Sequence, residues 1–196
     1  MSDSRLPAPS AAILERFANG LGEIYGIDLI SVILYGSAAS GHFNGKQSNL
    51  NTLIVLKDIS IPSLKRCAKF IDKPAFRSIT PIFMDEEHIG TSQDVFPIEF
   101  LDIKDNYKVL SGTDPLKDIT VDPKNLRYQC EHDLKSVAIT IRQSYIKYGR
   151  GAGELNAILF RAATSALHIL RNVLRLKGVA APHERSAAIA AAKSVL

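Results

Sequence analysis

The chain has 196 residues, of which 46% are hydrophobic and 22% charged, the composition of an ordinary soluble globular protein. This length allows one substantial core with a smaller appended unit, or two modest domains. No apolar run reaches the roughly 20 residues that a membrane helix needs, and residues 1–10 lack the basic cluster and apolar core of an export signal. We therefore expect a cytoplasmic protein with no membrane partner, in which Cys67 and Cys130 are reduced thiols.

The net charge of +4 is unevenly distributed along the chain. Residues 1–122 carry 12 Lys and Arg against 16 Asp and Glu, whereas residues 123–196 carry 12 against 4. Such a change in composition indicates a domain boundary near Pro123. It also makes the C-terminal half the better candidate for binding phosphate-bearing partners, although a solvated basic face explains the same charge.

The sequence pattern of the first half of the chain predicts alternating helices and strands. Ser10 is expected to cap a first helix that ends at Gly26. Residues 29–35 and 50–56 are short, rich in aliphatic residues and predict buried strands. A helix over 62–71, a strand over 79–84 and a short helical or irregular link over 85–93 follow. Residues 96–103 predict a fourth strand with Pro97 near its start, and 107–110 an edge strand.

After residue 122 the pattern is helical only. Apolar residues at helical spacing predict a long helix ending at Gly149, a second ending before Gly178 and a third after Pro182. Mixed strands and helices followed by helices alone predict an α+β fold, with a mixed-sheet domain over 1–122 and an all-α helical bundle over 123–196. We expect further helices or a partner chain, such as a second copy in a homodimer, to complete the bundle.

The most informative segment lies between the first two predicted strands. The first strand leads into Gly36-Ser37, eleven residues follow, and Asn49-Leu50-Asn51 opens the second strand. This arrangement resembles the signature of the polymerase-β-like nucleotidyltransferases, in which a strand ends in Gly-Ser or Gly-Gly and a second strand about a dozen residues later carries Asp-x-Asp. The helical second half is similar to the C-terminal bundles of kanamycin-type nucleotidyltransferases.

The chemistry of that signature explains the residue types. A glycine lets the backbone approach a triphosphate, and carboxylates at i and i+2 on a strand face the same side and can hold a pair of Mg²⁺ ions. This chain has Asn49 and Asn51 at the aspartate positions. An amide brings no negative charge to offset the repulsion between two divalent ions. We therefore predict no metal ligands, weak Mg²⁺ binding at best and impaired nucleotidyl transfer.

The resemblance also implies a third carboxylate from a neighbouring strand. The segment 96–103 offers Glu99 and Asp102 as catalytic candidates. On a regular strand these two residues would face opposite ways, so only one could join the site, and Glu99 is narrowly preferred. The alternative is that both are surface residues.

Three functions remain open from the sequence. The first is a degenerate nucleotidyltransferase that binds ATP or another NTP through Gly36, Ser37, Lys46, Asn49 and Asn51. The second is an active enzyme that moves NMP from NTP to a hydroxyl acceptor. The third is a non-catalytic oligomerisation or interaction module.

A basic stripe on the second long helix adds a nucleic-acid partner as a further hypothesis. Its residues recur at helical spacing and are Arg161, His168, Arg171 and Arg175. The alternative reading of this stripe is a solvated helix face.

Overall fold

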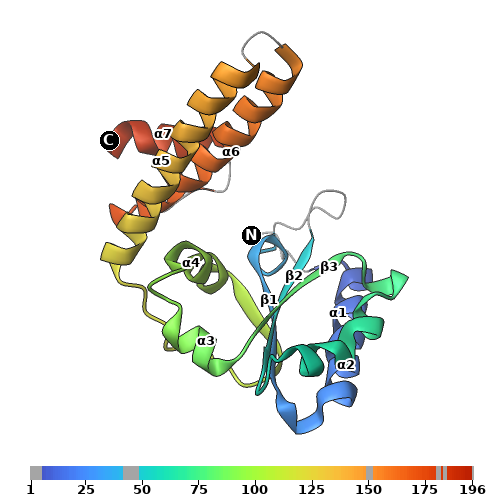
Figure 1. Cartoon of the computed structure of the whole chain (residues 1–196). Helices are drawn as coiled ribbons and strands as arrows, with labels where there is room; N and C mark the ends of the chain where they lie inside the picture. Colours follow the sequence, from blue (N-terminus) through green and yellow to red (C-terminus); the bar gives the residue numbers. More distant parts are fainter. Residues whose placement is uncertain (1–5, 42–48, 149–151, 180–181, 183–184, 196) are drawn as a thin grey trace. The chain divides into compact units, whose positions relative to one another are not determined.

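The computed structural model describes residues 6–41, 49–148, 152–179, 182 and 185–195 (Figure 1). By their internal contacts these residues form two compact units. The first comprises Met1–Gln93 with Glu99–Thr120, and the second comprises Asp94–Ile98 with Val121–Leu196. The sequence predicts a boundary after residue 122.

The first unit is built on a four-stranded mixed sheet with the strand order β3-β2-β1-β4. The strands are β1 (Leu29–Tyr35), β2 (Leu50–Leu56), β3 (Ile79–Met84) and β4 (Tyr107–Gly112). β1 is antiparallel to both β2 and β4, and β2 is parallel to β3. The three strands predicted from aliphatic runs are confirmed, and the edge strand extends two residues beyond its predicted end.

Helices α1 (Ala8–Tyr25) and α2 (Ile61–Ile71) cover one face of this sheet (Figure 1). The prediction that Ser10 caps α1 is wrong, because the helix begins at Ala8 after Pro7 and has no side-chain cap. Pro9 lies in the first turn, where the N–H that proline lacks has no helical partner in any case. The predicted end at Gly26 is confirmed: Gly26 has φ 56° and leads into a short 3-10 helix, η1 (Gly26–Asp28).

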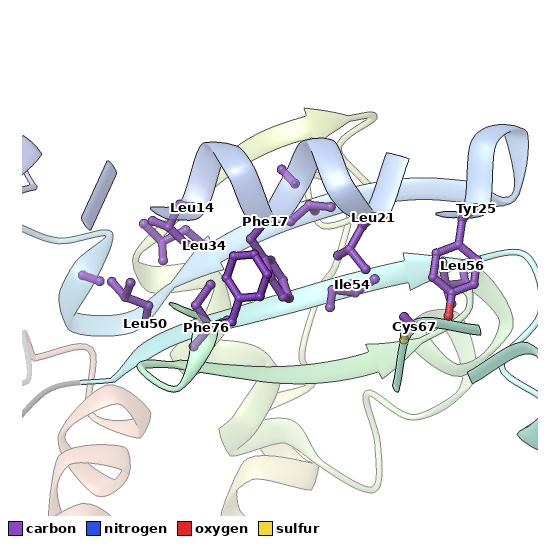
Figure 2. Close-up of a cluster of buried hydrophobic side chains, with 14 residues drawn as sticks. Leu14, Phe17, Leu21, Tyr25, Leu34, Leu50, Ile54, Leu56, Cys67 and Phe76 are labelled. Carbon is purple, nitrogen blue, oxygen red and sulfur yellow. The ribbon is translucent and has the colours of Figure 1, made fainter. Parts of the chain in front are cut away.

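The core of this face is a hydrophobic cluster that includes Phe17 of α1 and Phe76 of η3 (Pro74–Phe76), both labelled in Figure 2. Phe70 of α2 packs against this cluster. The ring centroid of Phe17 lies 5.8 Å from that of Phe70 and 5.2 Å from that of Phe76. Gly20 leaves the room for this packing, since a Cβ there would lie 2.2 Å from the Phe70 ring. From the sheet, Val32, Leu34, Leu50, Ile54 and Leu56 contribute to the cluster.

Helices α3 (Glu86–Thr91) and α4 (Pro97–Asp105) lie on the other side of the sheet (Figure 1). The strand predicted over 96–103 is therefore wrong, because these residues form α4. Pro97 occupies the first helical position, where proline favours helix initiation. In α4, the buried Ile98 and Phe100 are two residues apart as in a strand, whereas the buried Ile103 follows Phe100 at helical spacing. β4 takes the place in the sheet next to β1.

The second unit contains α5 (Pro123–Tyr148), α6 (Ala152–Leu176) and α7 (Arg185–Val195). These are the three predicted helices. α5 and α6 pack along each other, and α7 packs on α6 and buries Ala188 and Ala192. Among the residues that the structure describes, no helix is long and apolar enough to cross a membrane.

Candidate functional site

The turn after β1 is held in a fixed conformation by backbone hydrogen bonds. Gly36 has φ 75°, a left-handed conformation that favours glycine, and it opens the short 3-10 helix η2 (Gly36–Ala38). Its N–H donates to the Asn106 carbonyl at 2.9 Å. Its carbonyl accepts from the N–H groups of Ala39 at 3.0 Å and Ser40 at 3.1 Å. Ser37 is thereby presented at the end of β1 in a defined turn.

The structure brings the two halves of the predicted motif together. Tyr35 of β1 pairs with Asn51 of β2, and a Cβ placed on Gly36 would lie 3.5 Å from Nδ2 of Asn51. Asn49 directly precedes β2 and is exposed, while Asn51 is half-buried. Gly36, Ser37, Asn49 and Asn51 therefore gather at one end of the sheet. Lys46, the fifth predicted binding residue, lies outside the described residues.

A row of four side chains crosses the sheet at this end. In strand order they are Thr80, Asn51, Tyr35 and Tyr107, as the pairing registers show. They alternate with the residues of the core cluster, so they lie on the opposite face of the sheet, the face of α3 and α4. No local sequence motif marks Thr80 or either tyrosine as a site residue, because cross-strand neighbours depend on the register of strands far apart in sequence.

The row carries no formal charge at neutral pH. Burial raises the pKa of Tyr35 above its ordinary value, so its phenol stays protonated. Burial and the hydrogen bond to Asp114 also raise the pKa of Tyr107, whose hydroxyl donates to Asp114 Oδ2 at 2.9 Å. The row thus offers an amide, three hydroxyls and two aromatic rings.

This donor set does not fit the pair of Mg²⁺ ions that the fold family implies. On the strands flanking Asn51, the paired residues are Tyr35 and Thr80, and neither is a carboxylate. Hard divalent cations prefer several anionic oxygen ligands. Within the described part of the chain, no group of three or more His, Cys, Asp or Glu residues is arranged to hold a metal ion.

The two predicted acids lie on α4 rather than on a strand, which changes their relation to each other. Three residues apart on a helix, Glu99 and Asp102 share a face instead of pointing to opposite sides. Asn106, whose carbonyl binds Gly36, follows α4 directly, so the C-terminal end of this helix reaches the site. Asp102 is half-buried and lies one turn before that end, whereas the exposed Glu99 lies about one turn further back.

The basic stripe on α6 takes part in the internal structure of the second unit. Arg171 Nε donates to the Pro182 carbonyl at 3.1 Å, and Arg175 Nη1 donates to Oδ1 of the buried Asn172 at 2.6 Å. The first contact joins α6 to the segment that precedes α7, and the second lies within α6 itself. A nucleic-acid partner for the stripe stays a prediction.

The mixed sheet, its helices and the helical second unit match the nucleotidyltransferase fold of a solved adenyltransferase. Among solved structures, the chain is similar to spectinomycin adenyltransferase AAD(9) from Enterococcus faecialis, a structure determined with ATP and spectinomycin. The TM-score is 0.50 at 13% sequence identity, and the match covers 95% of this chain and 90% of that one. No family model matches the sequence, and no curated protein matches it in a sequence comparison.

Proposed function

We propose that this protein binds ATP or another nucleoside triphosphate at the end of β1 and has lost efficient metal-dependent nucleotidyl transfer. The observation that carries the proposal is the close approach of Gly36 to Asn51, together with the lack of a carboxylate in the row to which Asn51 belongs. In this proposal the phosphates lie against the Gly36–Ser37 turn, and Lys46, which lies outside the described residues, stays a predicted phosphate ligand. Asn49 and Asn51 contact the nucleotide through neutral amides, at the positions where the family pattern has aspartates that hold metal ions.

Two features support nucleotide binding by this fold. The solved neighbour contains ATP, which makes the nucleotide the natural first ligand to test. The turn after β1 also has a conformation that favours glycine: φ at Gly36 is 75°, and an alanine there would be destabilising by roughly 1–2 kcal/mol.

The alternative is a transferase that works with altered metal ligands and moves NMP from NTP to a hydroxyl acceptor. In that case Asp102, and Glu99 beside it on α4, would be the acids available at the end of the helix that meets Gly36. Turnover that requires Mg²⁺ and is lost in Asp102→Asn would favour this alternative over a pseudoenzyme.

Calorimetric titration of ATP with Mg²⁺ and with EDTA tests the proposal. We expect saturable binding whose dissociation constant differs by less than about twofold between the two conditions, because no anionic metal ligands stand beside Asn51. Gly36→Val, which adds a β-branched side chain toward Asn51 at a positive φ, should abolish binding. The matched control is Gly90→Ala on α3, where an added Cβ meets nothing within 4 Å. If ATP and the other NTPs all fail to bind, the proposal is wrong.

We further propose that the helical unit forms a homodimer through the exposed apolar side of α6. Leu159 and Phe160 are 42% and 65% exposed, and the only charged residue between Leu155 and Leu167 is Arg161. A largely apolar helix face can pack on its own copy with little repulsion between like charges. Arg185 lies over the Phe160 ring, 5.8 Å from its centroid, at the border of this face. Light scattering should give the mass of a dimer for the parent and that of a monomer for Phe160→Glu. A monomeric parent would contradict this.

A further inference from the structure

We propose that the nucleoside part of the ligand is bound by stacking its base on the rings of Tyr35 and Tyr107, with the Asn51 amide at its edge. This inference deepens the proposed function and rests on it. It assigns two residues that the nucleotidyltransferase signature does not contain.

The two tyrosines are held close together by the register of the sheet. Tyr35 pairs with Tyr107, and the N–H of Gly36 donates to the carbonyl of Asn106. Gly36 and Asn106 are the residues next to Tyr35 and Tyr107 along the two strands. Hydrogen-bonded and non-hydrogen-bonded pairs alternate along an antiparallel ladder, so the bond between Gly36 and Asn106 makes Tyr35 and Tyr107 a non-hydrogen-bonded pair. In such pairs the Cα atoms are only about 4.5 Å apart and the side chains are neighbours on one face.

The tyrosine row is also where this face of the sheet opens to solvent. The next row inward contains Ile33 and Leu53, which are both completely buried. Tyr35, Tyr107 and Asn51 are each half-buried, so part of each side chain is accessible. Large aromatic rings at such a border are available to a ligand on one side and supported by the core on the other.

Tyr107 is fixed at both ends of its side chain. Its backbone lies in the β4 ladder, and its hydroxyl donates to Asp114 Oδ2 at 2.9 Å. Asp114 itself accepts from the Leu116 N–H at 3.0 Å, which orients the carboxylate. A ring held in this way loses little conformational entropy when a ligand stacks on it.

The chemistry of the row suits a base better than a polyphosphate. It contains no cation that would attract phosphate and no anion that would hold a metal. Aromatic rings stack on any nucleobase, and an asparagine amide can both donate to and accept from the edge of adenine. Thr80 adds a hydroxyl on the far side of Asn51. The phosphates would then extend toward the Gly36–Ser37 turn.

Titrations of adenosine, ATP and inorganic tripolyphosphate in EDTA test this inference. We expect adenosine to bind within roughly tenfold of ATP, because the base supplies much of the affinity. Tyr35→Leu and Tyr107→Leu should each weaken adenosine binding by roughly tenfold or more, whereas Tyr35→Phe keeps the ring and should stay within about threefold. Tyr128→Leu is the control, since Tyr128 is a 62% exposed tyrosine on α5, in the other unit.

The outcomes separate this inference from the proposed function. If ATP and tripolyphosphate bind equally well and adenosine does not bind, stacking is wrong and phosphate binding stands. If adenosine binds and the Leu variants bind it as well as the parent does, the base lies elsewhere and the inference is also overturned. If neither nucleoside nor nucleotide binds, both proposals fail. Should the Leu variants lose their fold in circular dichroism, the three titrations of the parent decide alone.

Discussion

Replacing Gly112 with alanine is expected to destabilise the first unit by roughly 4 kcal/mol, a large part of the stability of a typical domain. Gly112 ends β4 with φ 86°, so any side chain is strained there. A Cβ would also lie 2.0 Å from the Ile30 carbonyl oxygen, which belongs to the backbone and has no rotamer to change. Moving β4 away would break the bond from the Thr113 N–H to that carbonyl, 3.1 Å long.

The same displacement would disturb a buried hydroxyl. Ser31 is completely buried and its Oγ lies 2.7 Å from the Thr113 carbonyl and 3.2 Å from that of Ser111, on either side of Gly112. A buried hydroxyl that loses its partners costs about 1–3 kcal/mol. The whole end of β4 is therefore expected to loosen together.

Urea denaturation followed by circular dichroism measures this loss. Gly26→Ala is the matched control in the same unit, because Gly26 also has a positive φ, 56°, but a Cβ there meets nothing within 4 Å. The free energy of unfolding of the control should fall only by the cost of the backbone strain, roughly 1–2 kcal/mol. Equal losses in the two variants would mean that β4 accommodates the methyl group, and that the close approach of Gly112 to Ile30 is not maintained in solution.

The fold was predictable wherever one local pattern allowed one interpretation. Residues 29–35, 50–56 and 79–84 are short and aliphatic, too short for buried helices, and each is a strand. The segment 96–103 allowed two interpretations. Its apolar residues suit a half-buried strand or a short helix, and Pro97 is tolerated at the start of either. In the structure the place beside β1 is taken by Tyr107–Gly112, and a pairing between segments so far apart in sequence is a property of the whole unit.

In the candidate site, the residues of the motif were predictable and their cross-strand neighbours were not. The spacing of Gly36-Ser37 and Asn49-Leu50-Asn51 implied that two adjacent strands would bring them together, and Gly36 and Asn51 do meet. The neighbours of Asn51 were not predictable. Thr80 reaches it through the parallel register of β3, and Tyr107 lies beside Tyr35 only because β4 pairs with β1. These registers are set by the packing of both faces, so no local sequence pattern contains them.

Restoring the two carboxylates should make the site respond to Mg²⁺. In the double variant Asn49→Asp/Asn51→Asp, two negative charges replace neutral amides at Asn51 in β2 and at Asn49 directly before it. Without metal their repulsion is expected to lower the melting temperature slightly, and Mg²⁺ should restore it. With ATP present, Mg²⁺ should raise the affinity of the variant roughly tenfold or more, because phosphate oxygens complete the coordination. The ATP affinity of the parent protein should change by less than about twofold when Mg²⁺ is added.

The row around Asn51 limits how far this restoration can go. Tyr35 and Thr80 flank the new carboxylate at residue 51, so no sheet neighbour supplies a third anionic ligand. The variant should therefore need millimolar rather than micromolar Mg²⁺, and adding Thr80→Asp should lower that requirement. The single variant Asn19→Asp, on the exposed side of α1, controls for added charge. If Mg²⁺ changes neither melting temperature nor ATP affinity in the double variant, Asn49 and Asn51 do not stand at a former metal site. In that case the loss of charge there cannot explain a loss of transfer.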